Sequence, residues 1–245
     1  MKHSLNADRL SAINLCAILA LVVICLAFGA APCAAKIGYI SAPSTPDPKS
    51  LKATSGNTVV AEVTDVDFVA IGAAHTAINR PMGVLFGNLW HEYLDVHAKA
   101  WVPAKCLNVY VNLSKDRVIF RYAQTPETAG IEAANFAEAY PEPGSFAQFY
   151  SGRVRDYLES TVRYDKFGGC WFMDLGKRGD SGSGLLDSKG CVVALVKGVS
   201  DENGVTKVDP ICREEVESAL EAIRSGHPER AGYVEIGPDG RVPRM

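Results

Sequence analysis

The sequence is poor in the residue patterns that bind metals and nucleic acids. Of its 245 residues only five are histidines and seven are cysteines. None of them stands in a CxxC or closely paired His/Cys arrangement of the kind that holds structural zinc. Lys and Arg number 25 against 28 Asp and Glu, so no excess of positive charge favours nucleic acid. The sequence therefore predicts no metal, no organic cofactor and no nucleic-acid partner.

Charged side chains are also missing from one long segment. Residues 11–35 contain no Asp, Glu, Lys or Arg and follow a basic N-terminus. Such a run predicts a secretory signal peptide or a membrane anchor, which we assign to residues 1–35. The small residues Cys33-Ala34-Ala35 at its end favour cleavage. In either case we expect the remaining chain on the translocated side of a membrane, either secreted or membrane-anchored.

Four cysteines follow that segment, and an even number in a translocated chain allows two disulfides. Four buried thiols are the alternative, and the sequence does not decide between them. These cysteines are Cys106, Cys170, Cys191 and Cys212.

The rest of the chain has the pattern of an all-β protein. Residues 36–57 are rich in Pro, Ser and Gly and read as a linker. From Thr58 onward, short apolar runs alternate with turn signals, which is typical of a barrel or sandwich. The runs fall into a first lobe at about 58–123 and a second at about 140–212. We expect a short helix near 131–139 between them.

The C-terminal part predicts one helix and a tail. Val216, Leu220 and Ile223 recur at helical spacing, so we expect a helix from Arg213 to Arg224. The folded domain then covers 58–225. Residues 226–245 are rich in Pro, Gly and charge and predict a loose tail.

The most informative motif is Gly179-Asp180-Ser181-Gly182-Ser183-Gly184, followed by the apolar run Cys191–Val196. Glycine lacks a Cβ, so such a turn can adopt positive φ and bring N–H groups close to a substrate carbonyl. The N–H groups of Gly179 and Ser181 would form an oxyanion hole for a serine nucleophile. A surface turn between two strands is the plainer alternative.

A serine nucleophile needs a histidine base and an acid that orients the base. Asp116 stands between the histidines and Ser181 in the sequence and is the candidate acid. His91, after the apolar stretch that ends in Trp90, is the preferred base. His75 is the second candidate, with little β sequence before it to build half a barrel.

These residues carry a resemblance to known families. The stretch from Gly83 to His91, the segment around Asp116 and the triplet Ser181-Gly182-Ser183 resemble the flavivirus polyprotein protease. The segment from Gly179 to Gly198 resembles the alphavirus capsid protease, although both families have proline where this chain has Gly184. Residues Gly72 to His75 look like the Ala-Ala-His of cellular trypsin-like proteases, which would make His75 the base.

The resemblance implies a fold and an activity. The fold would be two antiparallel β-barrels of the chymotrypsin-like serine protease type, with a C-terminal helix. His91, Asp116 and Ser181 would form the triad of a serine endopeptidase that hydrolyses polypeptides through an acyl-enzyme. The alternatives are an inactive binding or structural protein with this fold, or a protease that cleaves itself once.

The resemblance also implies positions that bind substrate. Asp174 lies close to the place of a flavivirus aspartate associated with a preference for basic side chains, and a carboxylate there would pair with Lys or Arg. Lys197 and Gly198 fall on the strand that lines the pocket. Flavivirus proteases complete the first lobe with a strand from a membrane-bound protein partner. By analogy we expect a strand from residues 36–57, with Lys36–Ile40 the best segment, or from a separate protein.

Overall fold

The computed structural model describes most of the chain after the N-terminal segment. Within the described residues no helix is long and apolar enough to cross a membrane. The predicted signal or anchor at 1–35 and most of the predicted linker lie outside them. The described residues are 37–40, 56–79, 84–85, 91–95, 100–104, 106–128, 131–151, 154, 156–200, 203–237 and 239–243.

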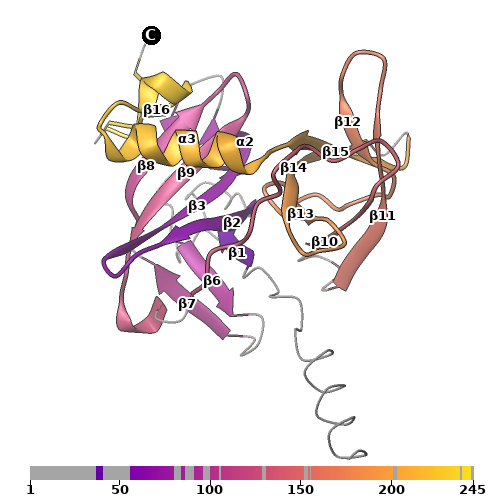
Figure 1. Ribbon diagram of the computed structural model, residues 1–245. Coiled ribbons are helices and arrows are strands. Elements are labelled where there is room, and N and C mark those ends of the chain that lie inside the picture. Colours follow the sequence, from indigo (N-terminus) through magenta and orange to yellow (C-terminus); the bar gives the residue numbers. More distant parts are fainter. Residues whose placement is uncertain are drawn as a thin grey trace, which may run out of the picture. The chain divides into compact units, whose positions relative to one another are not determined.

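The first lobe is built on one antiparallel sheet (Figure 1). Its strands in spatial order are β16 (Val234–Glu235), β8 (Cys106–Asn112), β9 (Arg117–Ala123), β3 (Asp67–Ala73), β2 (Gly56–Val63), β1 (Ile37–Ile40), β6 (His91–Asp95) and β7 (Ala100–Ala104). A separate pair, β4 (Ile78–Asn79) and β5 (Val84–Leu85), follows the short helix α2 (Ala74–Ala77).

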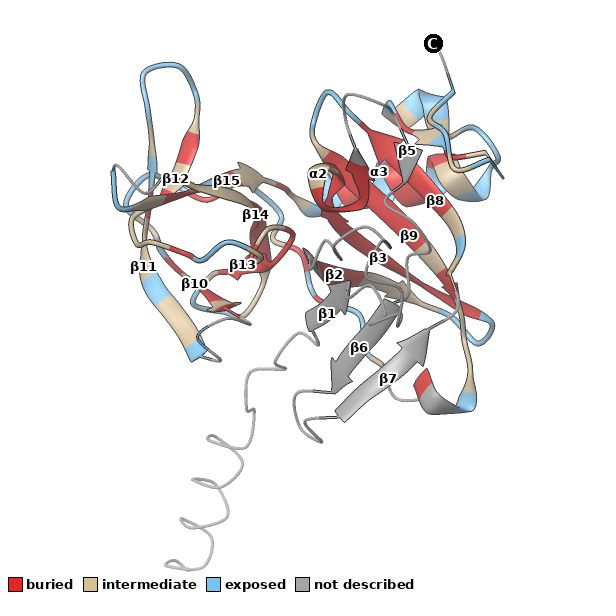
Figure 2. Cartoon of the chain, turned by 180° about the vertical axis from the view of Figure 1, so that it is seen from behind, coloured by how far each residue is buried: buried red, intermediate tan, exposed pale blue. Residues whose placement is uncertain are grey.

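The residues of the central strands β3 and β9 are mostly buried, as Figure 2 shows. Along β3, Phe68 and Ala70 pack in one apolar cluster while Val69 and Ile71 pack in another. A strand that is buried on both faces needs apolar residues at every position rather than at alternate ones. The continuous run Phe68–Ile71 meets that requirement.

The second lobe is a closed antiparallel barrel. Its strands in order around the barrel are β10 (Phe146–Ser151), β11 (Asp156–Tyr164), β12 (Cys170–Phe172), β15 (Val205–Pro210), β14 (Val192–Ser200) and β13 (Gly184–Leu186). Along β10 the odd-numbered positions Ala147, Phe149 and Ser151 are buried and their neighbours are not. This period of two places one face of each strand in the barrel interior.

The helix α3 (Arg213–Arg224) forms over the predicted residues and joins the two lobes. Its apolar residues Val216 and Leu220 belong to one buried cluster with Ile119 of the first lobe and Leu195 of the second. In Figure 1 it lies across β8 and β9. Because this cluster contains side chains from both lobes, apolar burial holds them together.

Three expectations differ from the structure. Among the described residues only the second lobe forms a closed barrel, and the first sheet runs open from β16, which pairs with β8, to β7. The 3-10 turns are η1 (Pro126–Thr128) and η2 (Pro228–Ala231), and the described residues 131–140 contain no helix. The C-terminal segment is not loose up to Ile236, because Tyr233 and Ile236 bury apolar side chains against the first lobe.

The predicted strand from the N-terminal segment is confirmed by the pairing of β1. Ile37 pairs with Val59 of β2, and Gly38 pairs with Tyr93 of β6. The strand beside β2 thus comes from this chain rather than from a separate protein, which was the alternative.

The four cysteines are free thiols rather than two disulfides. Burial raises the pKa of Cys106 to about 12 and that of Cys170 to about 11. These two thiols therefore stay protonated at neutral pH and behave as apolar side chains.

We predict that β1 stabilises the first lobe. A chain that begins at Gly56 loses the partner of β2 and β6, so its melting temperature should fall by several degrees, because even about 1 kcal/mol shifts it by that much. A chain that begins at Lys36 keeps β1 and is the matched control. Thermal unfolding followed by circular dichroism measures both. Equal melting temperatures for the two chains would contradict the role of β1.

Candidate active site

Asp116 is presented by the turn between β8 and β9 in an unusual backbone conformation. Its φ of 57° makes it the one non-glycine residue with positive φ among the described residues. Asn112 fixes this turn, because its Oδ1 accepts hydrogen bonds from Ser114 Oγ (2.7 Å) and from the Lys115 N–H (3.0 Å). A left-handed Asp or Asn costs free energy unless its surroundings hold it, and such residues concentrate at functional sites.

Asp116 holds the start of α2 through three contacts, two of which are to His75. The Asp116 carbonyl accepts the Ala74 N–H at 2.9 Å, and Oδ1 accepts the His75 N–H at 3.0 Å. The second carboxylate oxygen, Oδ2, lies 2.8 Å from His75 Nδ1. An acid on Nδ1 leaves Nε2 as the ring nitrogen that can take a proton from a nucleophile. This pair, with His75 one-third exposed, therefore has the arrangement of a catalytic base and its orienting acid.

The two candidate histidines stand in different positions. His75 lies in α2, which follows β3 directly. His91 begins β6, where it pairs with Ala104, and its side chain falls outside the described residues. The objection to His75 was the shortage of β sequence before it, yet β1, β2 and β3 all precede it.

The turn before Ser181 is tight and requires glycine. The Asp180 N–H donates to the Lys177 carbonyl (3.0 Å) and closes a tight turn in which Gly179 has φ 102°. A positive φ at the third position defines a type II turn and requires glycine there. Gly182, after the serine, also has a positive φ of 92°.

Asp180 anchors this turn from inside the second barrel. The residue is fully buried, and the hydroxyl of Ser151 donates to its carboxylate at 2.8–2.9 Å. Asp180 Oδ2 also accepts the Lys177 N–H at 2.7 Å. A buried carboxylate needs such donors. Ser151 is thus a supporting residue that the sequence did not single out, because it lies far from the motif in the chain.

Ser181 is half-buried beside β14. Its Oγ donates to the Lys197 carbonyl at 3.2 Å. Lys197 and Gly198 line the same pocket as Asp116. The lobes approach closely here, since a Cβ on Gly184 would lie 2.7 Å from Cγ2 of Val59. That contact explains why this chain has glycine at position 184, where the two viral protease families have proline.

Asp174 is half-buried on the loop that follows β12. Its Oδ1 accepts the Leu175 N–H at 2.7 Å, and among the described residues Oδ2 has no partner. Thr206 of β15 holds this loop, because it donates to the Asp174 carbonyl (2.8 Å) and accepts the Gly176 N–H (2.6 Å). The Asp174 carboxylate can therefore pair with a cation. Thr206 is a further supporting residue that the sequence did not reveal.

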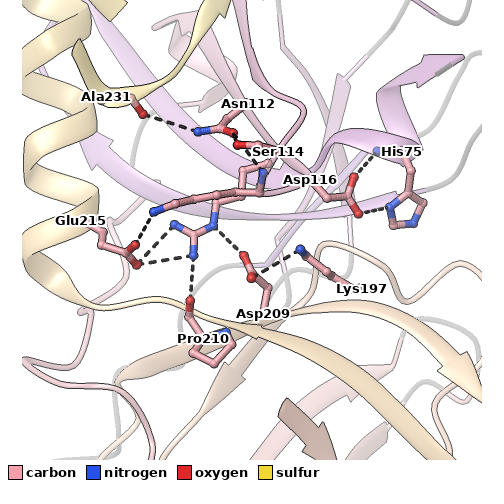
Figure 3. A network of polar contacts seen from close by, with 11 residues as sticks. His75, Asn112, Ser114, Asp116, Lys197, Asp209, Pro210, Glu215 and Ala231 are labelled. Atoms are coloured by element: carbon pink, nitrogen blue, oxygen red, sulfur yellow. Dashed lines mark hydrogen bonds and ion pairs between the residues drawn. The ribbon is translucent and has the colours of Figure 1, made fainter. Parts of the chain in front are cut away.

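Arg117, next to Asp116, connects the two lobes through Asp209, Pro210 and Glu215, which Figure 3 labels. Its side chain is only 5% exposed. Nε donates to Asp209 Oδ2 at 2.6 Å, Nη2 donates to the Pro210 carbonyl at 2.7 Å, and Nη1 reaches Glu215 Oε2 at 3.3 Å. Lys115 and Lys197 add contacts to Glu215 and Asp209 respectively. The residue after the candidate acid is thus tied to β15 and α3.

Ion pairing sets the charge states of this network. Burial alone would lower the pKa of Arg117, but Asp209 and Glu215 raise it above its ordinary value. Burial would raise the pKa of Glu215, yet Lys115 and Arg117 hold it below its ordinary value of 4.5. A carboxylate whose pKa is lower in the folded state than in the unfolded state stabilises the fold at a pH above the unfolded-state pKa. That contribution is lost as the pH falls through the lower folded value.

Comparison with known proteins identifies the family and the fold. The family model described as alphavirus core protein, Peptidase_S3, matches residues 96–229, which is more than half of the chain. Among curated protein sequences none matches significantly. The reported matches do not show the flavivirus resemblance that pointed to His91.

Solved protease structures share the fold. The active form of the Rv3671c protease from M. tuberculosis has 17% identity and a TM-score of 0.54, covering 86% of this chain and 87% of that one. The serine endoprotease from Yersinia pestis has 11% identity and a TM-score of 0.55, covering 80% and 65%. Tobacco etch virus protease bound to product has 11% identity and a TM-score of 0.52, covering 84% and 82%. At these identities the likeness establishes the fold alone.

We predict that Arg117→Ala destabilises the protein by about 3–5 kcal/mol, because it leaves Asp209 and Glu215 partly buried without their main cation. Arg121→Ala on the same strand removes an ion pair with Asp67 whose arginine is 42% exposed, and should cost at most about 1 kcal/mol. Urea unfolding at pH 7 measures both variants. Similar losses for the two would show that Arg117 is an ordinary surface ion pair.

Proposed function

Because the chain belongs to the Peptidase_S3 family of alphavirus core proteins and is a serine-type peptidase, we propose that it is an endopeptidase with a Ser181–His75–Asp116 triad. Its substrate is a polypeptide. The observation that carries the proposal is the pairing of Asp116 with His75. Asp116 lines one pocket together with Lys197, whose carbonyl accepts a hydrogen bond from the hydroxyl of Ser181. His75 is here proposed as the base in place of His91, which the sequence favoured.

The proposed mechanism assigns one role to each group. Ser181 Oγ attacks the scissile carbonyl, while His75 Nε2 takes the serine proton and then donates it to the leaving amine. Asp116 keeps Nδ1 protonated and stabilises the imidazolium. The N–H groups of Gly179 and Ser181 donate to the developing oxyanion, and each such donor contributes roughly 3–4 kcal/mol in related sites. Water then hydrolyses the acyl-enzyme by the same groups.

The substrate strand would lie along β14 beyond Val196. Pairing between β13 and β14 ends at Leu195, so the outer edge of Lys197–Ser200 has no strand partner among the described residues. Backbone groups on such an edge can accept an extended peptide as an added strand. The peptide would then pass directly by Ser181, which contacts the Lys197 carbonyl.

We expect His75→Ala, Ser181→Ala and Asp116→Ala each to lower peptide hydrolysis by at least about 10⁴-fold, without additive losses in combinations. A fluorophosphonate probe should label Ser181 in the wild type but not in His75→Ala. His91→Ala is the matched control and should keep both labelling and hydrolysis. Loss of activity in His91→Ala together with a fully active His75→Ala would identify His91 as the base. Absence of labelling in the folded wild type would support an inactive protease-fold protein.

We also propose cleavage after Lys or Arg, with Asp174 as the partner of the basic side chain. The support is the half-buried carboxylate whose Oδ2 has no partner among the described residues. Asp174→Asn should lower kcat/KM for such substrates by about 10-fold or more, in line with a charge-assisted hydrogen bond. Peptides varied at the cleaved residue measure this preference. An unchanged profile in Asp174→Asn would remove the role.

We propose that the domain acts on the translocated side of a membrane, released or tethered, as the uncharged residues 11–35 suggest. Expression of the full chain followed by protease protection and N-terminal sequencing tests this. The expected result is a protected domain, either beginning near Lys36 or retaining the N-terminal segment. A full-length chain in the cytosolic fraction would contradict it.

A further inference from the structure

The crevice beside the proposed triad contains a pocket of about 340 Å³, which is near the lower limit for small-ligand sites. One wall comes from the β8–β9 turn, with Leu113, Ser114 and Asp116. The other wall comes from the second barrel, with Trp171, Lys207 and the segment Lys197–Ser200. The volume suits one side chain of a bound peptide rather than a large ligand.

Strand register places the polar residues of the barrel wall on its outer face. Gly198 pairs with Lys207, and Lys207 pairs with Trp171, so these three residues share one face of the sheet. The next position along β15, Thr206, is fully buried, as is Phe172 beside Trp171. Lys207 and Trp171 therefore point away from the barrel interior, toward the pocket that they line.

A β-bulge brings a second lysine to the same pocket. The register between β14 and β15 shifts between Val196 and Gly198, which makes Lys197 the extra residue. A bulge interrupts the alternation of a strand and redirects a side chain. Lys197 and Gly198 can thus both line the pocket, although they are consecutive. A Cβ on Gly198 would meet no atom within 4 Å, so the floor of the pocket is open.

Two lysines supply the positive charge of the pocket, and of these Lys207 has no ion pair among the described residues. The carboxylate of Asp116 is engaged by His75, and Lys197 Nζ lies 3.4 Å from Asp209, which also pairs with Arg117. Asp165 accepts a hydrogen bond from the indole N–H of Trp171 at 2.9 Å. This hydrogen bond and, to a smaller extent, the charge of Lys207 lower the pKa of Asp165. Ser200 Oγ accepts a hydrogen bond from Asn203 at 3.0 Å, so its hydroxyl proton can donate elsewhere.

We propose that this pocket binds the carboxylate of a Glu or Asp side chain of the polypeptide substrate, with Lys207 and Lys197 as the cations. The residue concerned belongs to the stretch of substrate that lies along β14, because Gly198 is part of both that edge and the pocket floor. The inference rests on the proposed peptidase function and specifies its substrate class. An aspartyl or glutamyl side chain is small enough for the pocket and matches its ammonium groups.

Hydrolysis of internally quenched peptide libraries tests the proposal. Glu, Gln or Lys is fixed in turn at each position near the scissile bond, with the other positions randomised. The wild type should prefer Glu over Gln at one position by about 5-fold, the scale of a partly exposed ion pair, and should disfavour Lys there. Lys207→Glu should reverse the preference, and Gly198→Leu should abolish it by filling the floor. Lys189→Gln, an exposed lysine in the β13–β14 turn, is the matched control and should retain it.

A binding measurement separates this proposal from the peptidase function. Fluorescein-labelled peptide pools that contain the fixed Glu or Gln are titrated against Ser181→Ala, with binding followed by anisotropy. Tighter binding of the Glu pool, weakened by Lys207→Glu, supports the pocket even if the wild type proves inactive. Equal affinity for the two pools, or no Glu preference in an enzyme that cleaves the libraries, overturns the acidic subsite and leaves the peptidase standing. Failure of the fluorophosphonate to label the wild type would count against the peptidase instead.

Discussion

The buried guanidinium of Arg117 is the contact on which the proposed site depends. It lies in the first lobe, directly after Asp116, and bonds to Asp209 and the Pro210 carbonyl of β15 and to Glu215 of α3. A cation that is 5% exposed is tolerated only with such a complete set of acceptors. The start of β9 is therefore fixed relative to the second lobe.

From that fixed point the proposed catalytic geometry follows in short steps. Asn112 shapes the turn, and Asp116 takes its left-handed conformation between Asn112 and Arg117. The Asp116 carbonyl and carboxylate then hold the start of α2 and with it His75. On the other lobe, Ser151 and the Lys177 N–H hold Asp180, which sets the turn before Ser181. Each lobe contributes one half of the site, and Arg117 links the halves.

Much of this could be predicted from local sequence. The motif around Ser181 predicted a tight turn because glycine is required where φ is positive, and Gly179 and Gly182 have that conformation. The apolar spacing from Val216 to Ile223 predicted α3, since a 12-residue amphipathic helix has a clear period. Asp116 was identified through its order in the chain and its charged-then-apolar surroundings, and the structure pairs it with a histidine.

The rest depends on contacts between distant residues, which leave little local trace. Arg117 and Asp209 are 92 positions apart, and neither segment contains a local pattern that predicts contact with the other. β16 has two residues, too few to show a period, and it lies next to Gly- and Pro-containing sequence. β1 has four residues and was predicted only by analogy with the flavivirus proteases. The preference for His91 over His75 rested on the flavivirus resemblance and on the shortage of β sequence before His75, and β1, β2 and β3 supply that β structure.

The most direct test of the central claim is a proton NMR spectrum of the imidazole N–H region at low pH and temperature. A hydrogen bond from an imidazolium N–H to a buried carboxylate shifts that proton far downfield. The account predicts one such resonance, lost in both His75→Gln and Asp116→Asn and retained in His91→Gln. A downfield resonance that persists in His75→Gln and disappears in His91→Gln would contradict it.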